Sequence, residues 1–124
     1  MSSEIFNFEN LKGVTLKFVE FKKNGCRNGD ILTFRDTDGN TYEMYNDQDC
    51  CESVWLEDQC GSWVDILNTP ILSAHVIESE QERGCTWTFY TLVTIHGSMT
   101  LRWIGESNGY YSESVSFTKL KIDP

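Results

Sequence analysis

The chain has 124 residues, enough for one hydrophobic core but too few for two, so we expect a single domain spanning residues 1–124. Hydrophobic residues make up 40% and aromatic residues 13%, so burial can offset chain entropy, which excludes a disordered chain. A net charge of -9 disfavours direct binding to duplex phosphates, and no run reaches the roughly 20 apolar residues of a membrane span. The N-terminus also lacks the apolar core of a signal peptide, so we expect a soluble cytoplasmic protein.

The first half of the chain predicts one helical turn followed by three strands. Residues 7–13 fit a short helical turn, and residues 14–21 alternate in polarity well enough for a strand. Residues 31–45 contain two further alternating runs, which flank the dipeptide Asp38-Gly39. That dipeptide favours a tight turn, so we predict a β-hairpin there.

The second half predicts one short helix among several strands. Ser62 is a suitable N-cap for a helix over residues 62–68, and Pro70 would end it. The strands expected in this half cover residues 53–57, 71–78, 85–95, 99–104 and 114–122. The whole pattern predicts a mainly β (α+β) fold, an antiparallel curved sheet or sandwich of about seven or eight strands with one short helix.

The cysteines and histidines favour neither a disulfide framework nor a cofactor. Five cysteines is an odd number, and Cys50 and Cys51 are adjacent, so we expect reduced thiols. The chain has no C-x-x-C spacing and its two histidines are isolated, which argues against zinc. Carboxylates beside Cys50 and Cys51 would raise a thiol pKa, which argues against a catalytic cysteine. Taken together, these patterns lead us to expect no metal, no cofactor and no catalytic residue.

Acidic residues are concentrated in the middle of the chain. From Asp36 to Glu82 there are twelve carboxylates and no lysine or arginine. Such a block is most often a solvated face that keeps a protein in solution. It would also attract a basic groove on another protein, so mimicry of nucleic acid is an alternative.

The run Gly105–Ser112 carries more recognition chemistry than a turn needs. It lies between a strand that ends at Ile104 and one that begins at Ser114, so we predict a hairpin turn built on Asn108-Gly109. One carboxylate, two serines and two tyrosines surround that turn. Because binding residues tend to lie on loops held by a rigid scaffold, the run predicts a recognition surface.

Arg102 stands at the entrance to that run. If strand alternation buries Trp103, Arg102 points to the opposite face of the sheet. On that face the neighbouring strand is expected to present Thr88, Tyr90, Thr94 or His96. Arginine binds phosphate with a bidentate fork and tyrosines stack on bases, which suits a nucleotide-like ligand. The alternative is that Arg102 pairs with Glu106 or Glu113.

Three runs, Gln48–Val54, Thr86–Tyr90 and Arg102–Ser112, resemble the hallmark runs of a small family of unknown function found mostly in bacteriophages and prophages. The resemblance covers residues 32–117 and implies a phage origin and a place in the host cytoplasm, but no activity. By analogy, small acidic phage proteins counter host defence by blocking a defence protein or by sequestering a nucleotide-derived immune signal.

The leading hypothesis is a phage-encoded binding protein that sequesters a nucleotide-derived signalling ligand without turnover. Its expected ligand-binding residues are Arg102, Trp103, Glu106, Ser107, Asn108, Tyr110, Tyr111, Tyr90, Asp49 and Glu52. A homo-oligomer would bury more of such a ligand than one thin sheet can. One alternative is an acidic inhibitor that docks on a basic host defence protein through residues 36–82, and another is a small hydrolase of the same signal.

Overall fold

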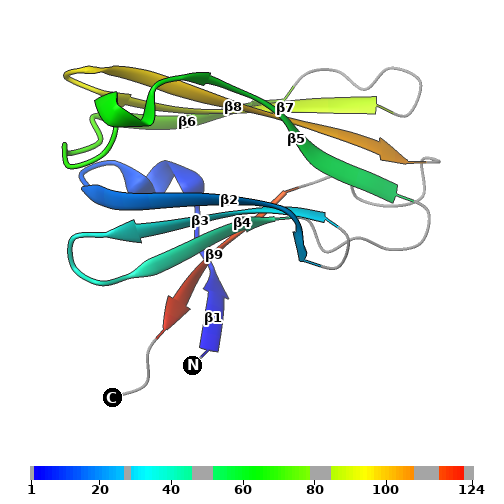
Figure 1. The fold of residues 1–124 in the computed structure, drawn as a ribbon, viewed down its shortest axis with the longest axis horizontal. Helices are drawn as coiled ribbons and strands as arrows, with labels where there is room; N and C mark the ends of the chain where they lie inside the picture. Colours follow the sequence, from blue (N-terminus) through cyan, green and yellow to red (C-terminus); the bar gives the residue numbers. More distant parts are fainter. Residues whose placement is uncertain (1, 27–28, 46–51, 79–84, 108–114, 122–124) are drawn as a thin grey trace.

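Two antiparallel β-sheets pack face to face in the structure, a computed structural model that describes residues 2–26, 29–45, 52–78, 85–107 and 115–121 (Figure 1). The five-stranded sheet contains β1 (Ser2–Ile5), β2 (Leu16–Cys26), β3 (Gly29–Asp36), β4 (Thr41–Tyr45) and β9 (Ser116–Lys121) in the order β1-β9-β4-β3-β2. The four-stranded sheet contains β5 (Glu52–Gly61), β6 (Ser73–Glu78), β7 (Cys85–Thr94) and β8 (Gly97–Ser107) in the order β5-β8-β7-β6.

The mainly β fold expected from the sequence is confirmed, and every predicted strand has a counterpart in the two sheets. The predicted hairpin is β3 and β4, and the helical turn near the N-terminus is the 3-10 turn η1 (Phe8–Leu11). The structure adds β1, an edge strand that pairs with β9. Its four residues are too few for a periodic pattern, so the sequence alone does not reveal it.

The α-helix predicted over residues 62–68 is wrong. The chain forms only the 3-10 turn η2 (Trp63–Asp65), and the side chain of Ser62 makes no capping hydrogen bond. Asn68 then adopts a left-handed φ of 63°, and its backbone N donates to the backbone O of Leu16. This segment must lead from β5 to β6 while it buries Ile66, so tertiary packing overrides its helical propensity.

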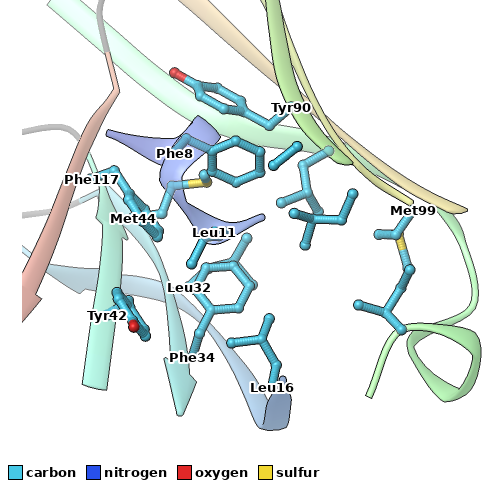
Figure 2. Packing of buried hydrophobic residues seen from close by; sticks show 14 of the residues in the cluster. Phe8, Leu11, Leu16, Leu32, Phe34, Tyr42, Met44, Tyr90, Met99 and Phe117 are labelled. Carbon is cyan, nitrogen blue, oxygen red and sulfur yellow. The ribbon is translucent and has the colours of Figure 1, made fainter. Parts of the chain in front are cut away.

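The hydrophobic core lies between the two sheets (Figure 2). Phe8 of η1 fills the space between them, with its ring centroid 5.1 Å from that of Tyr90 and 5.5 Å from that of Phe117. Trp103 Nε1 of β8 donates to Met44 Sδ of β4 over 3.1 Å, a buried contact that joins the two sheets. Each fully buried apolar side chain contributes roughly 1.5–3 kcal/mol, so this core provides a firm scaffold for the surface.

The turn between β3 and β4 is held by the buried carboxylate of Asp36. Its oxygens accept hydrogen bonds from the backbone N of Asp38 and Asn40, the side-chain N of Asn40 and the hydroxyl of Tyr42, each with a donor–acceptor distance of 2.9 Å. Burial alone would raise the pKa of Asp36, but these hydrogen bonds outweigh it and hold the pKa below its usual value. Burial and the bond to Asp36 raise the pKa of Tyr42.

Candidate functional site

The run Gly105–Ser112 is not a hairpin turn. Residues 105–107 continue β8, which belongs to the four-stranded sheet, whereas β9 belongs to the five-stranded sheet. The chain therefore changes sheets between Ser107 and Ser116, a path that local sequence cannot distinguish from a hairpin. Four of the expected ligand-binding residues lie outside the described residues: Asp49, Asn108, Tyr110 and Tyr111.

Three other expected site residues meet where β5 and β8 pair. The strand register sets Glu52 opposite Ser107 and Ser53 opposite Glu106. The fold thus brings the backbones of Glu52, Glu106 and Ser107 together, as is necessary if these residues belong to one binding surface. The side chains of these three residues lie outside what the structure describes.

Two further expected site residues, Trp103 and Tyr90, face the core. Trp103 is 1% exposed and Tyr90 is 7% exposed, so both belong to the scaffold and not to an accessible surface. Burial, together with the charge of Glu78, raises the pKa of Tyr90 to about 12, and its hydroxyl stays protonated near neutral pH. The expectation that Arg102 shares a face with Tyr90 is therefore wrong, since Tyr90 pairs with Leu101 and Arg102 pairs with Phe89.

The exposed face of β7 was predicted wrongly for a simple physical reason. Both faces of this strand carry residues that a core can accept, so alternation alone does not show which face is buried. Thr94, one of the residues assigned to the polar face, is buried because its hydroxyl donates to the backbone O of Asp65. Phe89, which pairs with Arg102, is instead half-buried on the outside of the sheet.

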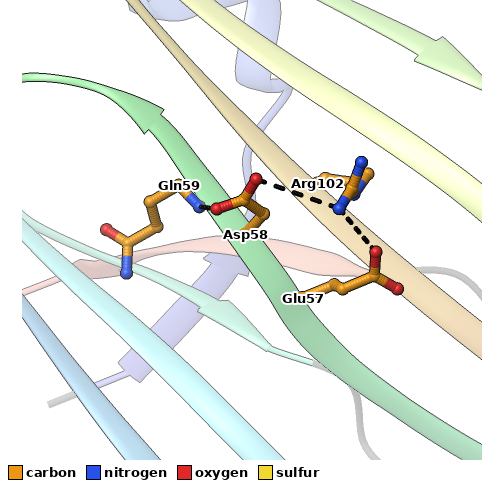
Figure 3. Close-up of polar contacts among 4 residues, drawn as sticks. All are labelled: Glu57, Asp58, Gln59 and Arg102. Carbon is orange, nitrogen blue, oxygen red and sulfur yellow. Dashed lines mark hydrogen bonds and ion pairs between the residues drawn. The ribbon is translucent and has the colours of Figure 1, made fainter.

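Arg102 points outward, as expected, and forms an ion pair with β5 (Figure 3). Its Nη2 lies 2.6 Å from Oε1 of Glu57 and 3.8 Å from Oδ2 of Asp58. The side chains of Arg102 and Glu57 are 39% and 33% exposed, so solvent screens the pair. The expected partners of Arg102 were Glu106 and Glu113, and neither Glu57 nor Asp58 was among them.

A β-bulge explains why Arg102 has two acidic neighbours. The register of β5 against β8 shifts between Leu56 and Asp58, so Glu57 is an extra residue and both acids lie beside one arginine. The backbone N of Gln59 donates to Oδ1 of Asp58 over 2.9 Å and fixes that carboxylate. In the sequence, only the adjacency of Glu57 and Asp58 hints at this pair of partners for Arg102. The bulge itself cannot be predicted from the sequence, because it depends on which strand pairs with β5.

Aromatic side chains surround Arg102 on the outer face of the four-stranded sheet. The register sets Phe89 opposite Arg102, and in the next row Ile104 stands between Trp55 and Trp87. Ile104 is 7% exposed although it faces outward, whereas both tryptophans and Phe89 are half-buried. We call these four residues and Arg102 the outer aromatic face.

A groove of about 350 Å³ adjoins the same carboxylates. It is lined by Phe21 of β2 and by Leu56, Glu57, Asp58 and Gln59 of β5, and we call it the acidic groove. Leu56 is buried, whereas Phe21 is 38% exposed and supplies the accessible apolar part of the lining. The groove combines apolar surface with two carboxylates at the edge of the sandwich.

Hydrogen bonds to β3 and η2 support the acidic groove. The backbone N of Leu56 donates to Oδ2 of Asp30, a buried carboxylate on β3, over 3.1 Å and ties the two sheets together. Trp63 Nε1 of η2 donates to Oε1 of Gln59 over 2.9 Å. These contacts hold the groove-lining part of β5 against the rest of the fold.

The remaining reactive side chains of the described residues are dispersed. Within those ranges, no group of three or more His, Cys, Asp and Glu side chains could hold a metal ion. Cys60 is an exposed free thiol on β5, and His75 and His96 are both exposed.

These features define an open two-sheet antiparallel β-sandwich with an acidic groove at one edge. The family model described as "Domain of unknown function (DUF7448)" matches residues 9–117, so the chain belongs to this family. The expectation of a family of unknown function is confirmed, over a longer stretch than residues 32–117. No curated protein and no solved structure matches the chain. The helical segments that the structure describes are too short to cross a lipid bilayer.

Proposed function

We propose that this protein is a non-enzymatic binding protein that docks on a basic partner protein through the acidic groove. The observation that carries the proposal is the lining of that groove, in which the exposed apolar surface of Phe21 adjoins the carboxylates of Glu57 and Asp58. Lysine and arginine side chains match such a lining, because their stems pack on apolar surface while their charged ends reach carboxylates.

Long-range charge supports the same mode of action. The groove lies within the segment from Asp36 to Glu82, which has twelve carboxylates and no basic residue, in a chain of net charge -9. Such a field attracts a basic surface and raises the rate of encounter. Arg102 neutralises part of the groove, since one guanidinium faces two carboxylates there.

The biological setting completes the proposal. The protein is phage-encoded, acts in the host cytoplasm, and counters host defence by occupying a basic site on a defence protein that otherwise binds nucleic acid. The resemblance of three sequence runs to a phage and prophage family supports the origin, and the acidic groove supports the mimicry.

Capture from extracts of a bacterial host, with matched variants, tests the proposal. The groove variant is E57Q/D58N, and the control is D38N/E78Q, which removes the same amount of charge from two exposed sites outside the groove lining. We expect a basic protein to be retained by the wild type and the control, lost by the groove variant, and released as salt rises from roughly 50 to 300 mM. Equal retention by both variants would overturn the proposal.

Capture of a nucleotide-derived ligand is a second candidate function, supported by the outer aromatic face. There Arg102 stands beside Phe89 and in the row next to Trp55 and Trp87, so a base could stack while the guanidinium contacts phosphate. Native mass spectrometry of protein from infected cells tests this mode. A bound nucleotide that R102Q fails to retain supports capture, and a cleaved product in place of the intact ligand indicates a hydrolase.

A further inference from the structure

We infer that two copies of this chain associate through their open sheet edges, with β2 of each copy paired to β5 of the other. Both strands stand at the ends of their sheets, and among the described residues each has a strand neighbour on one side only. Both also border the acidic groove, which Phe21 of β2 and Leu56 of β5 line together. With 11 and 10 residues, these edge strands are long enough to template pairing with a matching strand.

Hydrogen bonds within the chain define which part of each edge is open. Leu16 at the start of β2 accepts a hydrogen bond from the backbone N of Asn68, so with respect to the described residues β2 is open from Lys17 onward. The backbone N of Leu56 is occupied by Asp30, so on the same basis β5 is open from Glu57 onward. The parts left open are therefore those beside the acidic groove.

The two open edges have opposite charge. Lys17, Lys22 and Lys23 are exposed on β2, against a single exposed glutamate, Glu20. The Nζ of Lys22 lies 3.4 Å from Oε1 of Glu20, but both side chains are largely exposed, so this pair is weak and easily exchanged. Glu57 and Asp58 line the open part of β5 and share the single guanidinium of Arg102, so a second copy offers further cations to two carboxylates.

Apolar contacts fit the same arrangement. Phe21 of β2 is 38% exposed, unusually high for phenylalanine in a strand, whereas Phe18 lies on the opposite face of β2 with the guanidinium of Arg35 over its ring. Phe21 already lies beside Leu56 in the groove, so two copies would place two such pairs around one axis. Charged residues would then flank an apolar centre, as in stable protein interfaces.

A single two-fold rotation pairs both edge strands of each copy with edge strands of the other. Because β2 and β5 border the same groove, a rotation that sets β2 of one copy against β5 of its partner also sets β5 against the partner's β2. The open part of β2 is about ten residues or about 33 Å long, the open part of β5 is about five residues or about 17 Å long, and two layers with their side chains are about 20 Å thick. The interface would thus bury about 1,000 Å² in total, which matches the roughly 1,000 Å² that a specific interface needs.

Self-association has a regulatory consequence, which rests on the proposed function although the dimer itself does not. The dimer covers the acidic groove, so a basic partner and the second copy compete for Glu57 and Asp58. The net charge of -9 on each copy opposes association, but at physiological salt this repulsion is screened beyond about 8 Å while contacts in the interface are not.

Sedimentation velocity from about 1 to 200 µM at physiological salt tests the dimer. The wild type should form a dimer, K22E should weaken it at least tenfold because the contact occurs twice, and K12E should leave it unchanged. Lys12 is also exposed but lies outside β2, so K12E is a matched charge reversal. Circular dichroism of both variants confirms that they fold.

A wild type that stays monomeric over this range, or a dimer that K22E and K12E weaken equally, overturns the inference. The second outcome would point to general charge repulsion or to another interface. K22E leaves Glu57 and Asp58 intact, so capture of a basic partner should persist in this variant. Loss of the dimer with retained capture, or the reverse, therefore separates the failure of this inference from the failure of the proposed function.

Discussion

Replacement of Arg102 by glutamine distinguishes docking of a basic partner in the acidic groove from capture of a nucleotide-derived ligand on the outer aromatic face. The change should strengthen the first interaction and weaken the second. Arg102 Nη2 lies 2.6 Å from Glu57 and 3.8 Å from Asp58, so R102Q frees both carboxylates and adds about one negative charge beside the acidic groove. At about 6 Å in water-like surroundings, one charge pair contributes about 0.7 kcal/mol. A partner that places one cation in the groove should bind R102Q about threefold more tightly.

The same change should weaken the capture of a phosphate-bearing ligand. Hydrogen bonds to a charged group contribute about 1.5–3 kcal/mol, and glutamine cannot replace the guanidinium fork. The ligand should therefore bind R102Q at least about tenfold more weakly. Glutamine preserves much of the side-chain stem beside Phe89, so most of the packing on the outer face is kept.

Isothermal titration of wild type and R102Q with the captured partner, and with any retained nucleotide, measures both effects. R35Q is the matched control, since Arg35 is exposed on β3, stacks 5.6 Å from the ring of Phe18 and does not line the groove. Loss of the exposed ion pair should cost about 0.2–1 kcal/mol of unfolding free energy. A folded R102Q that binds the basic partner more weakly than R35Q does refutes the docking reasoning.

Three predictions concern the scaffold. D36N should lower the free energy of unfolding by about 1–3 kcal/mol at neutral pH in urea melts. Because folding lowers the pKa of Asp36, its contribution is complete above the unfolded value of 3.8 and is lost as pH falls through the folded value, so a pH-independent difference would contradict this account. G61A should reduce the melting temperature more than G39A does: both glycines have positive φ, but a Cβ at Gly61 would lie 2.4 Å from the backbone O of Ser98, whereas Gly39 faces open space. L101A should cost about 2–5 kcal/mol in denaturant unfolding because Leu101 is fully buried, and a cost below about 1 kcal/mol would show that the core is loosely packed.

The sequence predicted the strands because their signals are local. The hairpin of β3 and β4 needs only two alternating runs around Asp38-Gly39, and the structure confirms it. The helix over residues 62–68 failed because a capping residue and an apolar face are weak local preferences. Contacts of Ile66 and Asn68 with distant parts of the chain outweigh them.

The candidate site depended on strand order, which the sequence does not encode locally. Burial of Trp103 correctly placed Arg102 on an outer face. The partners of Arg102 follow from the pairing of β5 with β8 and from a bulge in β5, and Glu57 lies far from Arg102 in the chain. A periodic pattern contains neither fact, so the acidic groove could not be predicted before the two sheets were known.

The bulge in β5 connects the two candidate surfaces. A regular strand would send Glu57 and Asp58 to opposite faces, whereas the extra residue lets both carboxylates approach Arg102 on the outer aromatic face and also line the acidic groove. A ligand that draws Arg102 away would therefore leave the groove more negative, and a basic partner that engages the carboxylates would release Arg102. The two binding modes are thus coupled through three side chains, and occupation of one surface should favour occupation of the other.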